Sequence, residues 1–92
     1  MIAISWSPEK AVLLRNNPAR NNIGFEDCLL AIQEGRILRD EPNPSPKFPH
    51  QRMFVLNIES YAYVVPYVEN KHGIFLKTIF PSRKYTAKYL RA

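Results

Sequence analysis

Five basic side chains in the second half of the chain have the chemistry needed to act on a phosphodiester. Cleavage of RNA without a metal ion requires a group that accepts the 2′-hydroxyl proton, a group that protonates the leaving 5′-oxygen, and cations that stabilise the charged transition state. A single histidine ahead of a strand is more often a surface or hydrogen-bonding residue, so a histidine alone does not establish catalysis. The candidates for the three roles are His50, Arg52, Lys77, Arg83 and Lys84.

The segment Pro81-Ser82-Arg83-Lys84 places a serine-capped helix start directly after a predicted strand. The free N–H groups at such a helix end bind anions, and Arg83 and Lys84 would strengthen an anion site there. The alternative is ordinary capping of the helix by Ser82, which requires no ligand.

Three tyrosines lie at alternating positions of one predicted strand. The alternation of side chains along a strand puts Tyr61, Tyr63 and Tyr67 on one face of the sheet. The other face is aliphatic and is the expected packing surface for the helices, so we expect the tyrosines on a more open face together with Lys77. Tyrosines beside cations stack on bases and hydrogen-bond phosphates, as in sheets that bind RNA. The alternative is that they cover a half-exposed sheet.

The net charge of +5 is concentrated at the C-terminal end of the chain. Residues 71–92 contain six basic side chains and no acid, whereas residues 1–70 contain seven basic and eight acidic side chains. A basic segment of this kind suits a phosphate backbone or an acidic protein partner, and Lys88 and Arg91 extend it as RNA-binding candidates. A solvated helix face that maintains solubility is the alternative.

The composition argues against several other kinds of site. Cys28 is the only cysteine, so the chain can form neither an internal disulfide nor a zinc site built from cysteines. The sequence shows no glycine-rich phosphate loop, paired catalytic carboxylates or cluster of metal ligands, so we expect no metal and no cofactor. We also expect a cytoplasmic protein without a signal peptide or membrane span, because apolar stretches are short and interrupted by charges and prolines.

Hydrophobic patterns and turn residues predict a single α+β domain over residues 1–92, with helices packed on one face of a small antiparallel sheet. Pro66 falls inside a predicted strand, so that strand should carry a bulge there or leave that N–H side unpaired. The predicted elements are a strand at Ile2–Ser5, helices starting near Pro8 and Phe25, a short strand at Ile37-Leu38, a proline-rich loop over Asp40–His50, strands at Arg52–Ile58, Tyr61–Val68 and Gly73–Phe80, and a helix at Ser82–Arg91.

Several motifs in order resemble the RelE/BrnT-like toxins of bacterial toxin–antitoxin pairs. The resemblance covers most of the chain and includes its opening Trp6-Ser7-Pro8-Glu9-Lys10, the helix start Ile23-Gly24-Phe25-Glu26-Asp27, and the segment from Phe75 to Tyr85. It implies a small α+β ribonuclease with a basic C-terminal helix that cleaves messenger RNA without metal and is neutralised by a ribbon-helix-helix antitoxin. It also implies catalytic roles for Lys77, Arg83 and Lys84.

Two hypotheses about function follow. The first is that the protein is the toxin of a type II toxin–antitoxin system, a metal-independent endoribonuclease that inhibits translation and growth. The alternative is a non-catalytic basic module that binds RNA or an acidic partner. The basic C-terminal segment supports both, because cations serve binding and cleavage alike.

Overall fold

Capping residues delimit the two N-terminal helices in the computed structural model, which describes residues 3–18 and 21–90. Helix α1 (Pro8–Arg15) begins after Ser7, whose hydroxyl accepts a backbone N–H of the first turn. Helix α2 (Phe25–Gln33) begins after Gly24 and is followed by Gly35, which has a positive φ of 75°. Both starts and the glycine stop confirm the sequence prediction. No helix of the described ranges has the length and apolar content that crossing a membrane requires.

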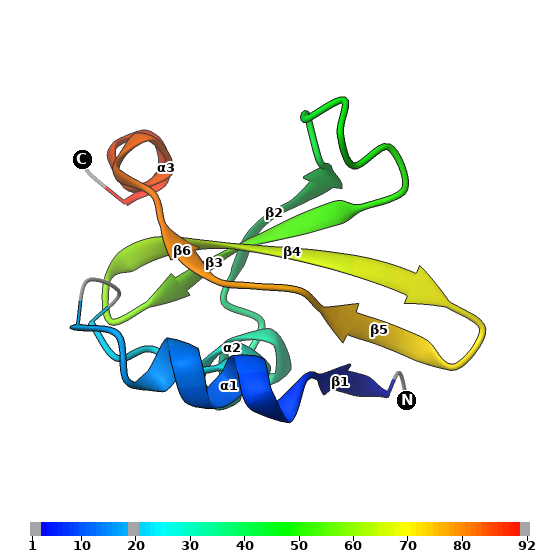
Figure 1. Ribbon diagram of the computed structural model, residues 1–92. Coiled ribbons are helices and arrows are strands. Elements are labelled where there is room, and N and C mark those ends of the chain that lie inside the picture. Colours follow the sequence, from blue (N-terminus) through cyan, green and yellow to red (C-terminus); the bar gives the residue numbers. More distant parts are fainter. Residues whose placement is uncertain (1–2, 19–20, 91–92) are drawn as a thin grey trace.

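Six strands, counted over the described residues, form one mixed sheet. They are β1 (Ile4–Trp6), β2 (Ile37–Pro42), β3 (Arg52–Ile58), β4 (Tyr61–Asn70), β5 (Gly73–Leu76) and β6 (Phe80–Pro81). The order is β1-β5-β4-β3-β2, with β6 beside β4 (Figure 1). β3, β4 and β5 form the predicted antiparallel meander, but β1 runs parallel to β5, so the expectation of a purely antiparallel sheet is wrong. Ile2, the first residue of the predicted opening strand, lies outside the described residues.

The predicted strand Gly73–Phe80 is divided into β5 and β6, and the division lies opposite Pro66 of β4. The Pro66 carbonyl accepts the Lys77 N–H at 2.8 Å. Because the N–H and C=O of a strand residue point to the same side, the N–H that proline lacks falls at this same edge. The register moves from Tyr67 opposite Leu76 to Val64 opposite Phe80, so the outer strand carries one extra residue. A bulge was one expectation for the strand that contains Pro66, but β4 is continuous there. The extra residue lies in the neighbouring strand, in residues 77–79, called here the bulge segment.

Helices cover both faces of the sheet, not one as expected. α1 and α2 lie below it in Figure 1, and α3 (Arg83–Tyr89) lies above it. α3 packs its Tyr85, with Leu90 after it, against a small cluster on the upper face, so that face has an apolar core of its own. The side chains of β3 and β4 in this cluster are Met53, Val55, Ala62 and Val64.

The tyrosines of β4 face α1 and α2, which corrects the expectation of an open tyrosine face. Tyr63 is 1% exposed and Tyr67 is 2% exposed, and Tyr61 is half-buried beside them. Their size explains the outcome, because the larger core under two helices requires large side chains, while the phenol oxygens still reach polar partners. Asn21 Nδ2 donates to the Tyr63 hydroxyl at 2.9 Å, and the Tyr67 hydroxyl donates to Asp40 at 2.6 Å.

Candidate functional site

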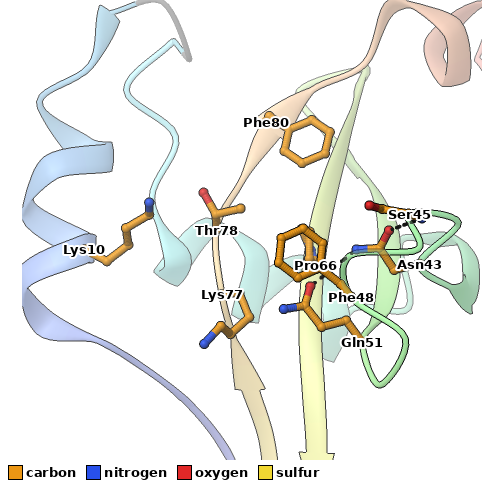
Figure 2. A pocket seen from close by; sticks show the side chains of 9 residues that line it. All are labelled: Lys10, Asn43, Ser45, Phe48, Gln51, Pro66, Lys77, Thr78 and Phe80. Atoms are coloured by element: carbon orange, nitrogen blue, oxygen red, sulfur yellow. Dashed lines mark hydrogen bonds between the residues drawn. The ribbon is translucent and has the colours of Figure 1, made fainter.

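A cavity of about 420 Å³ opens on the upper face, between the loop that joins β2 to β3 and the edge strand β6 (Figure 2). Pro66 belongs to this face because it alternates with Ala62 and Val64, which pack under α3. Four lining residues come from residues 43–51, called here the proline loop, and the others come from α1, β4, the bulge segment and β6. The cavity is lined by Lys10, Asn43, Ser45, Phe48, Gln51, Pro66, Lys77, Thr78 and Phe80.

The proline loop is held by its own backbone, which gives the cavity a defined wall. Its two ends are joined by the Asn43 N–H, which donates to the Gln51 carbonyl at 2.9 Å. Within the loop, Phe48 N–H donates to Ser45 O and Gln51 N–H donates to Phe48 O, each at 3.1 Å. Three prolines, Pro44, Pro46 and Pro49, restrict the intervening backbone. Phe48 is therefore presented by a stiff segment.

Two aromatic rings beside the cavity are unusually exposed. Phe48 is 47% exposed and Phe80 is 39% exposed, although each side chain is large and apolar. Both rings border the same cavity, which the buried Pro66 also lines (Figure 2). Exposed aromatic rings that converge on one concave site are typical of surfaces that bind a flat apolar ligand.

Two lysines make the cavity electropositive. Lys10 reaches it from α1, and Lys77 enters it from the bulge segment, where its ammonium also lies 5.3 Å from the centre of the Phe75 ring. Neither lysine forms an ion pair within the part of the chain that the structure describes, and no acid lines the cavity. The uncompensated charge favours an anionic ligand.

Of the five predicted catalytic residues, only Lys77 lines the cavity. His50 is exposed in the proline loop, next to Gln51 but outside the lining. The structure therefore does not bring a histidine and the predicted cations together in this cavity.

Arg52 has a structural role that the sequence did not indicate. Its Nε lies 3.2 Å from both Asp40 Oδ1 and the Tyr67 hydroxyl, and its Nη2 donates to the Asp40 carbonyl at 3.1 Å. Burial of the Tyr67 ring, together with the hydrogen bond to Asp40, raises the pKa of Tyr67 to about 12. The guanidinium is thus occupied in joining β2, β3 and β4 rather than being free for phosphate.

The predicted RNA-binding tyrosines and terminal cations differ in their exposure to solvent. Tyr63 and Tyr67 are enclosed below the sheet, so a base has no access to their rings, and Tyr61 is half-buried on that same face. Lys88 is exposed on α3. Arg91 lies outside the described residues.

α3 carries a row of exposed cations on the same side of the sheet as the cavity. Arg83, Lys84 and Lys88 are exposed, and the ammonium groups of Lys84 and Lys88 lie 5.5 and 5.3 Å from the centres of two stacked tyrosine rings. Ser82 Oγ accepts the Tyr85 N–H at 3.1 Å, so the serine caps the helix as the simpler alternative required. The side chains, not the helix end, carry the charge.

The carboxylate of Glu41 partly neutralises the positive charge of α3 near Lys88. Glu41 accepts the Tyr85 hydroxyl at 2.8 Å and pairs with Arg39 at 3.0 Å. The Tyr85 hydrogen bond and then the Arg39 bond lower the pKa of Glu41, with a smaller contribution from the charge of Lys88. Arg83 and Lys84 are therefore the cations of α3 best placed for an added anion.

Sequence reasoning missed most of the cavity. Asn43 and Phe48 come from Asp40–His50, a segment interpreted only as a stiff loop, and Gln51 directly follows it. The four prolines of Asp40–His50 were the signal that its side chains are held in place. Phe80 ends the predicted strand Gly73–Phe80, and nothing in the sequence indicated that its ring would be exposed at a cavity. Lys10 carried no signal, because only the packing of α1 beside the sheet edge brings it to the cavity.

Comparison of the chain with protein-family models, with curated proteins and with solved structures finds no match. The resemblance to RelE/BrnT-like toxins therefore rests on the sequence motifs alone.

Proposed function

We propose that the protein binds single-stranded RNA, with one base seated at Phe48 and Phe80 and a flanking phosphate near Lys10 and Lys77. The observation that supports this is the cavity itself, which combines two exposed aromatic rings with two unpaired lysines and no acid. Aromatic rings stack on any base, and cations attract the backbone. RNA is favoured because its recognition by proteins targets unstacked bases in loops and single strands.

The cations of α3 extend the interface beyond the cavity. Phe80 faces the cavity side because it pairs with Val64, and Arg83 follows it by three residues. Three residues span at most about 10 Å, so a strand whose base stacks on Phe80 has its neighbouring phosphates within reach of Arg83 and Lys84. Each lysine or arginine that contacts a phosphate releases counterions, which makes binding salt-dependent.

Fluorescence anisotropy with a labelled single-stranded RNA tests the proposal. Phe48→Ala and Phe80→Ala should each weaken binding roughly five- to hundredfold, because stacking on an aromatic ring is worth about 1–3 kcal/mol per base. Leu13→Ala is the matched control, since Leu13 is an apolar side chain that is 69% exposed on α1, outside the cavity. A duplex of the same sequence should bind more weakly, because its bases are stacked on each other.

Unchanged affinity in both phenylalanine variants would exclude the cavity as the site of base contact. If single-stranded DNA binds as tightly as RNA, the ligand is single-stranded nucleic acid in general and not RNA specifically.

Cleavage of the bound RNA is a second candidate function. The observation that favours it is that Lys77, to which the resemblance assigns a catalytic role, is also a residue of the cavity. Under this proposal the protein is the toxin of a type II pair, and an antitoxin with an acidic segment covers its basic face. Incubation of RNA with the purified protein in EDTA separates the two candidates. Fragments that disappear with Lys77→Ala support the nuclease, whereas intact bound RNA supports binding alone.

A further inference from the structure

Hydrogen bonds set the orientation of two side-chain amides in the cavity. Asn43 Oδ1 accepts the Ser45 N–H at 3.0 Å, and Asn43 Nδ2 donates to Gln51 Oε1 at 3.3 Å (Figure 2). Both amide oxygens therefore already accept a protein donor. The Gln51 Nε2 group, which carries two N–H donors, lies on the side of Lys77 in Figure 2 and is left for a ligand.

The other polar groups of the cavity are also mostly donors. The ammonium groups of Lys10 and Lys77 donate and cannot accept. The Ser45 hydroxyl accepts the Lys47 N–H at 3.3 Å and keeps a second lone pair, so the Ser45 and Thr78 hydroxyls are the side-chain groups of the lining that can either donate or accept. A ligand with acceptors on its edge is therefore complementary to the cavity, and a ligand with an amino group there is not.

The four RNA bases differ in this property. Guanine presents O6 and N7 as acceptors, and uracil presents the O4 carbonyl. Adenine shares the N7 acceptor but carries an amino group in place of O6, and cytosine carries an amino group in place of O4. An amino group turned toward Gln51 Nε2 and the two lysines would leave donors facing donors, and buried donors without an acceptor are costly. We infer that the cavity selects keto bases, uracil or guanine, over amino bases, and that Gln51 determines this selectivity. The inference rests on the proposed function, because it assigns the base that the cavity accepts.

Four short ribose-phosphate strands test the inference, each abasic except for one base, which is uracil, guanine, adenine or cytosine. All four carry the same phosphates, so differences in affinity report only on the base. Wild-type protein should bind the uracil or the guanine strand at least about fivefold more tightly than the adenine and cytosine strands, since a good pair of hydrogen bonds discriminates by about 1 kcal/mol or more. The comparison of uracil with guanine identifies which keto base is preferred.

Gln51→Glu should reverse the preference. One carboxylate oxygen can still accept the Asn43 Nδ2 group, while the other replaces the N–H donors by an acceptor turned toward the base. The added negative charge lowers the affinity for all four strands alike, so the ratio of the affinities for keto and amino bases is the informative quantity. Gln33→Glu is the matched control, because Gln33 is exposed at the end of α2 and the charge change is the same. Gln51→Leu, which removes the donors without adding charge, should bring the ratio close to one.

The outcomes separate the two proposals. Equal binding of all four strands by the wild-type protein, or an unchanged ratio in both Gln51→Glu and Gln51→Leu, would overturn the selectivity and leave RNA binding intact. Failure of the wild-type protein to bind any of the four strands at low salt would overturn the proposed function together with this inference.

Discussion

The salt dependence of RNA binding offers a quantitative test of which cations contact phosphate. Four cations are placed for this role, Lys10 and Lys77 at the cavity and Arg83 and Lys84 on α3. For single strands the slope of log affinity against log salt is roughly −0.7 per phosphate neutralised, so four contacts predict a slope of about −2.8. Between 50 and 200 mM salt the affinity should then fall by about 50-fold.

Replacing the two cavity lysines should halve this dependence. Lys10→Gln with Lys77→Gln leaves two contacts, a slope of about −1.4 and an affinity loss of only about sevenfold over the same salt range. The assay is fluorescence anisotropy at five or more salt concentrations, which gives slope and affinity together.

Lys71→Gln is the charge-matched control for each single replacement. Lys71 is exposed in the turn between β4 and β5 and does not line the cavity, so this variant should keep the wild-type slope. A Lys77→Gln slope equal to that of Lys71→Gln would refute the assignment, because general attraction by the net charge would then explain the salt dependence without any phosphate contact at Lys77.

Two further predictions concern the fold that positions the site. Thr86 Oγ1 accepts the buried Ala62 N–H at 2.8 Å and donates to Ser82 O at 2.7 Å, so Thr86→Val should lower the free energy of unfolding in urea by about 1–3 kcal/mol, and Thr86→Ser should recover most of the loss. A loss below a few tenths of a kcal/mol would show that this bond does not hold α3 on the sheet. Burial raises the pKa of the Cys28 thiol to about 12, so alkylation near pH 8 should be slow in the native protein and fast in urea. A raised pKa favours the folded state only while the thiol keeps its proton. The contribution of Cys28 to stability should therefore be complete below its ordinary pKa of 9.0 and should be lost as the pH rises toward 12. Comparing the free energy of unfolding of the wild-type protein with that of Cys28→Ala across this pH range measures the loss.

Local sequence features determined where most elements begin and end. Ser7 with Pro8 starts a helix, and Gly35 ends the next one, because capping and positive φ depend on a few adjacent residues. An irregularity at Pro66 was predictable for the same reason, since a missing N–H is a property of one residue. The sequence placed the bulge in the strand of Pro66, however, and the structure places it in the neighbouring strand. The prediction of a loop over Asp40–His50 was only partly right, because Asp40, Glu41 and Pro42 pair with β3 as the end of β2 and the loop begins at Asn43.

The choice of sheet face depended on tertiary packing. β4 is apolar on both sides, with tyrosines on one and Ala62, Val64 and Pro66 on the other, so its alternation could not show which side two helices would cover. The larger side chains filled the larger core, and their hydroxyls found partners in Asn21 and Asp40, which are distant in sequence. α3 then covered the opposite face.

The candidate site was divided in the same way between sequence and structure. The sequence alone determined that basic residues are abundant near the C-terminus, including Lys77, because charge is a property of composition. Only the tertiary structure brought Lys10, Phe48 and Phe80 to one cavity, since these residues are separated by more than thirty positions and belong to a helix, a loop and an edge strand. Contacts between such distant residues are set by how whole elements pack, and no local pattern of residues specifies that packing.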